Sequence, residues 1–169
     1  GCTVDAVQGF GVRFAMFNLG KAPWDNVKVR QACLYALDTD KMLANAFSGQ
    51  AEVATSYLPS SFANYHKAST VYAHDVDKAK KLISESGIIP GDVVLRTTDN
   101  EQVKSMATQV KNDLDALGFN VSIVSDTSPA TYAAIDAVDG SWDILLAPGD
   151  PSCFGADVDL LLNWWYGDN

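Results

Sequence analysis

The sequence predicts an α/β fold in which helices cover both faces of a largely parallel or mixed β-sheet. The first observation is that strand-like apolar segments alternate with segments of helical periodicity, and short turns join them. The second is that capping residues precede several helical segments and glycines follow them. The third is the run 142–147, whose nearly continuous apolar character predicts a strand buried on both faces. A chain of 169 residues with 47% hydrophobic content is expected to form a single domain with one core.

The first half of the chain predicts a strand, a long helix and an irregular segment. Residues 11–18 alternate well enough for a strand, and a turn follows at 19–23. A helix is expected over about 26–47, closed by Ser48 and Gly49. Cys33 falls on the apolar stripe of this helix, so we expect it to be a small core residue. From 50 to 73 the periodicity fades, which predicts a long ordered loop.

The second half alternates more regularly. Asp75 and Gly87 bound an expected helix over 76–86, and residues 93–98 form the next expected strand. A helix capped at Asp99 or Asn100 and ended by Gly118 follows. Its expected buried stripe consists of apolar residues at helical spacing: Val103, Met106, Val110, Leu114 and Leu117. The remaining expected elements are a strand beginning at Phe119, a helix from Ser128 to Gly140 and the strand 142–147.

Charge is distributed unevenly along the chain. The net charge is −9, and residues 112–169 hold ten Asp but no Lys, Arg or Glu. An acidic chain of this kind is not expected to bind nucleic acid, and most of these carboxylates are expected on a solvated surface. No apolar run approaches the roughly 18 residues that cross a bilayer. The pair Gly1-Cys2 has the form of the end of a lipoprotein signal, but this chain lacks the apolar segment of such a signal.

Signatures of catalysis, cofactor binding and metal binding are missing from the sequence. The glycines around Phe10 do not complete a dinucleotide-binding pattern, and there is no phosphate-binding loop or Gly-x-Ser-x-Gly elbow. The three cysteines form no Cys-x-x-Cys pair, and His66 and His74 are expected to be surface or loop residues. We therefore expect no catalytic residue, no cofactor and no metal site.

Ligands of parallel sheets bind where the strands end. Here those carboxyl ends are expected at 97–100, 124–128 and 148–154. The last of these presents Asp150 on a turn stiffened by Pro148 and Pro151. Asp150 is therefore either a ligand-binding carboxylate or a turn-capping residue.

Several runs, in this order, resemble the extracytoplasmic solute-binding proteins of peptide and nickel ABC importers, the oligopeptide- and dipeptide-binding group. They are Phe17-Asn18; Ala22-Pro23-Trp24-Asp25-Asn26-Val27-Lys28-Val29-Arg30-Gln31-Ala32; Tyr35-Ala36-Leu37-Asp38-Thr39-Asp40-Lys41; Gly49; Leu58-Pro59; Tyr72; Asp75; Ala79-Lys80-Lys81-Leu82; and Gly87. Their combined order is more specific than any single run.

The resemblance implies that residues 1–169 are most of the C-terminal lobe of a longer protein, a single three-layer αβα lobe of a two-lobed periplasmic-binding-protein-like fold. In that family the N-terminal lobe of the same protein closes over the ligand, and an ABC permease receives it. The implied location is extracytoplasmic, in the periplasm or on a cell-surface lipoprotein, and the implied ligand is a peptide.

The resemblance and the strand ends together suggest five ligand-binding residues: Asp150, Asn100, Lys104, Cys153 and Phe154. Asp150 matches the family carboxylate that pairs with a peptide amino terminus, although the Trp that many members carry beside it is missing. Lys104 is the nearest candidate for binding a ligand carboxylate. Two alternatives stay open: a nickel-chelate or oligosaccharide ligand, and a freestanding α/β enzyme using Asp150 with His66 or His74.

Overall fold

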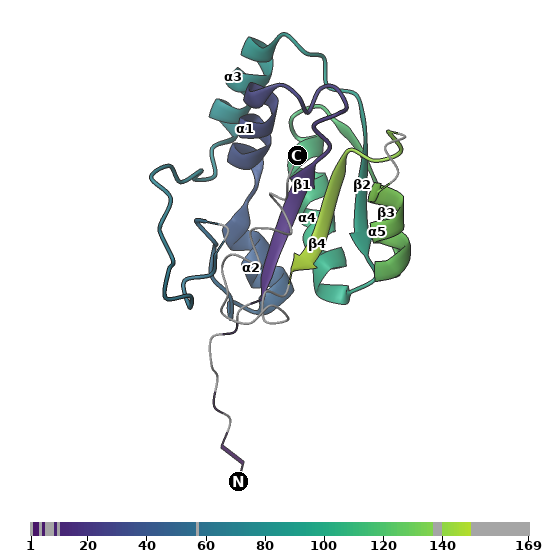
Figure 1. The fold of residues 1–169 in the computed structure, drawn as a ribbon. Helices are drawn as coiled ribbons and strands as arrows, with labels where there is room; N and C mark the ends of the chain where they lie inside the picture. The colour runs from purple at the N-terminus through teal and green to yellow at the C-terminus, as the bar shows by residue number, and fades with distance from the viewer. Residues whose placement is uncertain are drawn as a thin grey trace.

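The structure is a computed structural model that describes residues 2–3, 5, 9, 11–56, 58–136 and 140–149. Its helices and strands alternate as expected (Figure 1). In chain order they are β1 (Val12–Phe17), α1 (Val27–Ala36), α2 (Thr39–Phe47), α3 (Val76–Ser86), β2 (Asp92–Thr98), α4 (Glu101–Asp115), β3 (Asn120–Asp126), α5 (Ser128–Asp136) and β4 (Ile144–Gly149).

The four strands form one mixed sheet in the order β1-β4-β2-β3. Strand β2 pairs in parallel with both β3 and β4, whereas β1 runs antiparallel to β4. The register of β1 on β4 runs from Val12 opposite Gly149 to Phe17 opposite Ile144. The start of β1 therefore lies beside the end of β4, as the lower part of Figure 1 shows.

The sheet separates two apolar cores, which confirms the three-layer αβα prediction. Ile144 and Leu146 of β4 belong to a large core that includes residues of α1, α3 and α4. Leu145 and Ala147 of the same strand face the other way and pack with Tyr132 and Ile135 of α5. These four residues of β4 are all buried, as the apolar run predicts for a strand covered on both sides.

The prediction of one helix over 26–47 was wrong. The structure has two helices there, and Leu37 and Asp38 lie between them with extended or irregular backbone angles. Asp38 begins α2 as its N-cap, since its carboxylate accepts a hydrogen bond from Lys41 N, and its own N–H donates to Asp113 Oδ2 at 3.0 Å. These polar contacts favour the break over a continuous helix.

Other predicted boundaries agree closely with the structure. Asp75 caps α3, Gly87 follows it in the left-handed conformation at φ 74°, and Asn100 caps α4. The five residues of the expected α4 stripe are all buried. Cys33 is 2% exposed in the large core, and the described residues of 50–73 contain neither helix nor strand, as expected.

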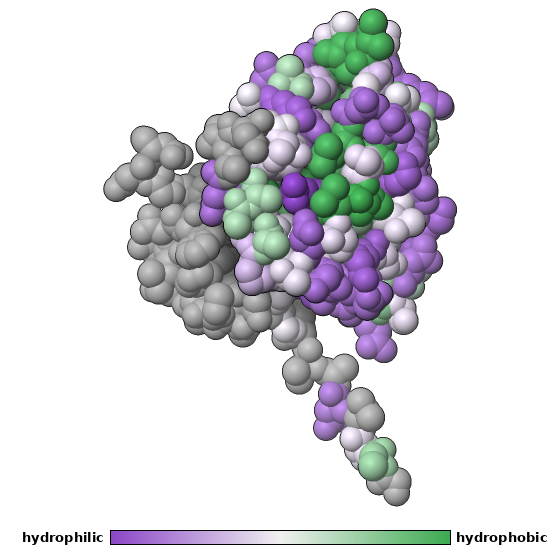
Figure 2. Space-filling model, turned by 90° about the vertical axis from the view of Figure 1, so that its right-hand side faces the viewer, coloured by the Kyte–Doolittle hydropathy of each residue, from purple (hydrophilic) through white to green (hydrophobic). Residues whose placement is uncertain are grey.

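Apolar side chains also reach the surface. Figure 2 shows apolar patches that interrupt a mostly hydrophilic face on the side of β3 and α5. Ile89, in the turn before β2, is 94% exposed. Patches of this kind are typical of surfaces that contact another surface.

Candidate functional site

The candidate site is the sheet edge at which the parallel strands end. Strands β2, β3 and β4 end at Thr98, Asp126 and Gly149, and α4 begins directly after β2. Because β1 is antiparallel, its first residues, Val12 and Arg13, join the same edge. Backbone groups, a helix N-terminus and side chains from several elements therefore meet where α/β sheets bind ligands.

Two of the predicted ligand-binding residues lie in the described part of this edge. Asn100 is exposed, and its Oδ1 accepts a hydrogen bond from Val103 N at 3.1 Å, which makes it the N-cap of α4. Lys104 Nζ lies 2.5 Å from Glu101 Oε1, one turn away on the same helix. Lys104 thus already has a carboxylate partner. The other three predicted residues, Asp150, Cys153 and Phe154, lie outside the described residues.

Arg13 is a residue of this edge that sequence reasoning did not select. Its Nη2 donates to Gln102 Oε1 at 3.4 Å, and its Nη1 donates to Val12 O at 3.2 Å. The guanidinium carbon lies 6.0 Å from the ring centroid of Phe47 at the end of α2. Strand β1, α2 and α4 therefore converge around this one side chain.

A second polar group lies on the face of the sheet that α5 covers. Arg96 Nη1 pairs with Asp126 Oδ2 at 3.0 Å across the neighbouring strands β2 and β3. Thr131 Oγ1 lies 3.3 Å from Thr97 O and from Asp126 O, so it ties α5 to the ends of these strands. The hydroxyl of Thr98 is buried and has no hydrogen-bond partner among the described residues.

Tyr132 joins α5 to the end of β4. Its hydroxyl donates to Pro148 O at 3.3 Å, and burial raises the pKa of this tyrosine above its ordinary value. The side chain is therefore neutral and acts as a hydrogen-bond donor at neutral pH. Together with Thr131, it holds α5 against the strands that end at the candidate site.

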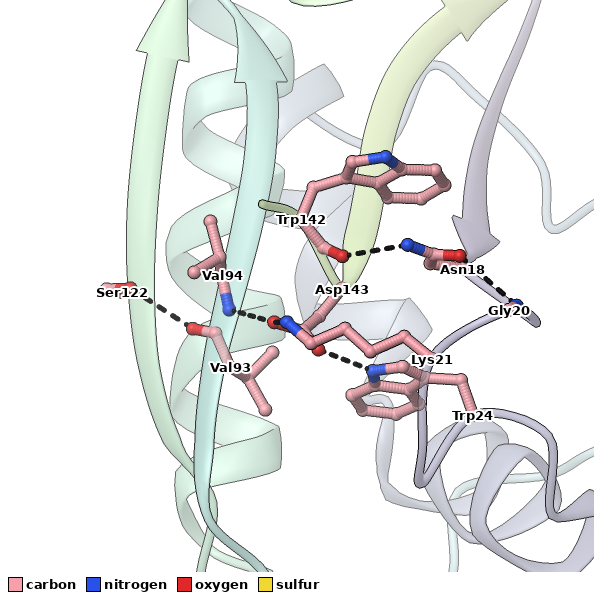
Figure 3. A network of polar contacts seen from close by, with 9 residues as sticks. All are labelled: Asn18, Gly20, Lys21, Trp24, Val93, Val94, Ser122, Trp142 and Asp143. Atoms are coloured by element: carbon pink, nitrogen blue, oxygen red, sulfur yellow. Dashed lines mark hydrogen bonds and ion pairs between the residues drawn. The ribbon is translucent and has the colours of Figure 1, made fainter. Parts of the chain in front are cut away.

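The opposite edge of the sheet carries a polar network, the Asp143 clasp, that has a structural role (Figure 3). Asp143 is 2% exposed, and its carboxylate accepts hydrogen bonds from Lys21 Nζ at 2.9 Å, Trp24 Nε1 at 2.8 Å and Val94 N at 2.8 Å. Asn18 completes the clasp by bonding the backbone oxygens of Asp143 and Trp142. The turn after β1 is thereby fixed to the residues that directly precede β4, and Asp143 is in turn bonded to Val94 of β2.

Asp143 is an exception to the expectation that most acidic residues of the second half lie on a solvated surface. Asp143 is buried, and Asp113, Asp115 and Asp126 each accept hydrogen bonds from other residues of the fold. The signal available in the sequence was the position of Asp143 directly before the buried run of β4.

The described residues include both histidines of the chain. They contain no group of three or more His, Cys, Asp or Glu residues placed to hold a metal ion. His66 and His74 are exposed on the segment between α2 and α3. Within the same described part, no helix has the length and apolar character needed to span a membrane.

Comparison with known proteins identifies relatives. Over 136 residues the chain is 33% identical to heme-binding protein A of Haemophilus influenzae, an alignment that covers 76% of this chain and 24% of that protein. It is 28% identical over 125 residues to the dipeptide-binding protein of Escherichia coli, covering 70% of this chain and 23% of the relative. The chain thus spans about a quarter of the length of these relatives.

Solved structures share the fold. The dipeptide-binding protein of Pseudoalteromonas sp. SM9913, solved in complex with Met-Leu, matches with a TM-score of 0.77 and 26% identity, over 88% of this chain and 31% of that one. Residues 3–169 also match the family described as "Bacterial extracellular solute-binding proteins, family 5 Middle". The chain therefore belongs to family 5 of the bacterial extracellular solute-binding proteins, which confirms the resemblance noted in its sequence.

Proposed function

We propose that this chain is a ligand-binding lobe of the substrate-binding protein of an ABC importer, and that it captures peptides without catalysing a reaction. The observation that carries the proposal is the convergence of β2, β3, β4 and the start of α4 at one sheet edge. A structural neighbour with the same fold holds the dipeptide Met-Leu. The chain would act as most of a C-terminal lobe, with the N-terminal lobe of the same protein supplying the other side of the cleft.

The proposed mechanism relies on Asp150 and on backbone groups at this edge. A carboxylate directly after β4 would pair with the amino group of a peptide, a charge-assisted hydrogen bond that contributes about 1.5–3 kcal/mol. Backbone groups can hold the rest of the peptide like an added strand, without selecting its side chains. Closure of the second lobe would exclude water and strengthen these contacts.

Asn100, Lys104, Cys153 and Phe154 belong to the same proposed site. Asn100 and Lys104 lie on the first turn of α4, so a ligand at the sheet edge would approach both of them. We further propose that the protein acts outside the cytoplasm, in the periplasm or as a cell-surface lipoprotein, and delivers its ligand to an ABC permease.

The test is calorimetry on the full-length protein with a panel of dipeptides and their N-acetylated forms. Asp150→Asn should weaken the binding of dipeptides about 10- to 100-fold, while N-acetyl dipeptides should bind weakly to both proteins. Asp99→Asn, a change at an exposed carboxylate beside the same edge, is the matched control and should leave affinity unchanged. Equal affinity of the Asp150 variant and the original protein would contradict the proposed role of Asp150.

Heme is the second candidate ligand, because the Haemophilus relative is a heme-binding protein. Thermal-shift measurements with hemin, an oligosaccharide, a nickel chelate and dipeptides separate these ligand classes. Stabilisation by any of the first three but not by dipeptides would replace the peptide proposal.

A further inference from the structure

We propose that Arg13 binds a carboxylate group of the captured ligand, and that this subsite lies between the start of β1 and the first turn of α4. The inference rests on the proposed function, since it names a chemical group that the ligand must carry. It assigns this role to Arg13 in place of Lys104, the residue at which the sequence resemblance pointed.

The position of Arg13 follows from the topology of the sheet. Arg13 lies opposite Pro148 in the β1–β4 register, next to the last residue of β4. Its contacts with Phe47 and Gln102 place the guanidinium on the side of the sheet that carries α2 and α4. The side chain therefore lies at the edge where a ligand would meet the carboxyl ends of the strands.

The bonding of Arg13 leaves its charge uncompensated within the described residues. The two hydrogen bonds of its guanidinium go to neutral acceptors, the carbonyl of Val12 and the side-chain amide of Gln102, and the latter bond is long at 3.4 Å. Its Nε is buried and has no hydrogen-bond partner in the part of the chain that the structure describes. None of the described carboxylates lies within ion-pair distance of it. A buried guanidinium N–H without an acceptor favours the arrival of one, and a carboxylate matches its planar geometry.

Lys104 differs from Arg13 in this respect. Its ammonium is 2.5 Å from Glu101, so a ligand carboxylate would have to compete with an existing partner. The N-terminus of the 15-residue helix α4 adds partial positive charge beside Gln102, and this charge assists an anion bound at Arg13. Arg13 is thus the better-placed cation for a carboxylate at this edge.

The experiment compares dipeptides that have free carboxyl termini with the corresponding dipeptide amides, by calorimetry on the full-length protein. The original protein should bind the acids about 10- to 100-fold more tightly than the amides. Arg13→Gln should lower affinity for the acids by that factor and remove the preference, while leaving affinity for the amides within about threefold. Lys80→Gln, a change at an exposed cation of α3 outside the proposed site, is the matched control and should keep the preference.

Arg13→Lys guards against a folding defect in the glutamine variant, because it keeps the charge and the aliphatic stem. It should bind the acids about 3- to 10-fold more weakly than the original protein and still prefer them to the amides. Persistence of the full preference in Arg13→Gln, or its loss in Lys104→Gln alone, would overturn the assignment to Arg13. If neither acids nor amides bind the original protein, the peptide proposal itself fails and this inference fails with it.

Discussion

Asp143 is held by donors from two segments that are far apart in the sequence: the turn between β1 and α1, which provides Lys21 and Trp24, and strand β2, which provides Val94. Its carboxylate is almost fully buried, so each of these donors would lose its partner in an apolar setting if the acceptor were removed. The local packing of this edge therefore depends on one negative charge.

Asp143→Asn should lower the free energy of unfolding by about 2–5 kcal/mol, since an amide keeps one acceptor and turns its NH2 group toward donors. Urea unfolding measures the difference. Asp99→Asn, at an exposed carboxylate, should change stability by less than about 0.5 kcal/mol. A similarly small effect of Asp143→Asn would show that the clasp contributes little to the free energy of unfolding.

Cys33 is expected to be chemically inert in the folded protein. Burial raises the pKa of its thiol to about 12, so very little thiolate forms at about pH 8. Iodoacetamide should therefore label the exposed Cys2 in the native state and label Cys33 only after urea is added. Mass spectrometry of the labelled peptides distinguishes the two sites, and equal native labelling would contradict the expected burial.

At the scale of the element, the break between α1 and α2 shows where helical periodicity misleads. The apolar stripe continues through Leu37, yet Asp38 forms a new N-cap and bonds Asp113 of α4. Periodicity detects which face is buried, whereas the break depends on a tertiary contact far along the chain. The sequence patterns of α3 and α4 were sufficient to predict where these helices begin, because each N-cap bonds a backbone N–H only three residues further along the chain.

Asn100 has a measurable role in α4 that is separate from any ligand contact. Asn100→Ala should cost about 1 kcal/mol of unfolding free energy because it removes the N-cap, and Asn100→Asp should keep it. Thermal or urea unfolding without ligand measures this effect. Equal stability of the alanine variant and the original protein would rule out the capping contribution.

Asp115 joins the end of α4 to β3 and should make stability depend on pH. Burial, the largest single influence, raises its pKa, but the hydrogen bonds from Lys111 and Val121 N and the charge of Lys111 together bring the pKa below its ordinary value. The stabilisation is thus fully present above the ordinary pKa of Asp and is lost as the pH falls through the lower, folded-state pKa.

The stability difference between the original protein and Asp115→Asn should accordingly be largest near neutral pH and shrink in strong acid. Urea unfolding over a pH series down to about pH 2 measures it. Lys111→Met should remove part of the same dependence, because Lys111 donates to Asp115 Oδ2 at 2.8 Å. A difference that does not change with pH would contradict this origin.

At the scale of the whole molecule, the αβα class follows from local patterns, whereas the composition of the site depends on strand direction. The alternation of elements does not say that β1 runs antiparallel, and that direction decides that Arg13, not Asn18, reaches the candidate edge. Asp150 could be selected because it follows a strongly apolar strand. Arg13 could not be predicted as a site residue, because the sequence of an alternating strand does not indicate at which edge of the sheet its arginine lies.

The chain spans about a quarter of its relatives, and under the proposal it provides one side of the cleft. The 169-residue chain alone should therefore bind a dipeptide at least about 100-fold more weakly than the full-length protein, a loss of about 3 kcal/mol of contacts from the other lobe. Calorimetry on both proteins tests this. Submicromolar binding by the chain alone would show that one lobe is sufficient.

The Asp143 clasp also affects the register of β1, and with it the face of the sheet on which Arg13 lies at the other end of this strand. The strand has six residues, so the clasp and Arg13 are separated by roughly 20 Å of extended chain. If β1 slipped by one residue, Arg13 would turn to the other face of the sheet and leave α2 and α4. By fixing Asn18, Lys21 and Trp24, the clasp disfavours that slip. Under the proposal for Arg13, a contact remote from the ligand would thereby help to set the specificity of the site.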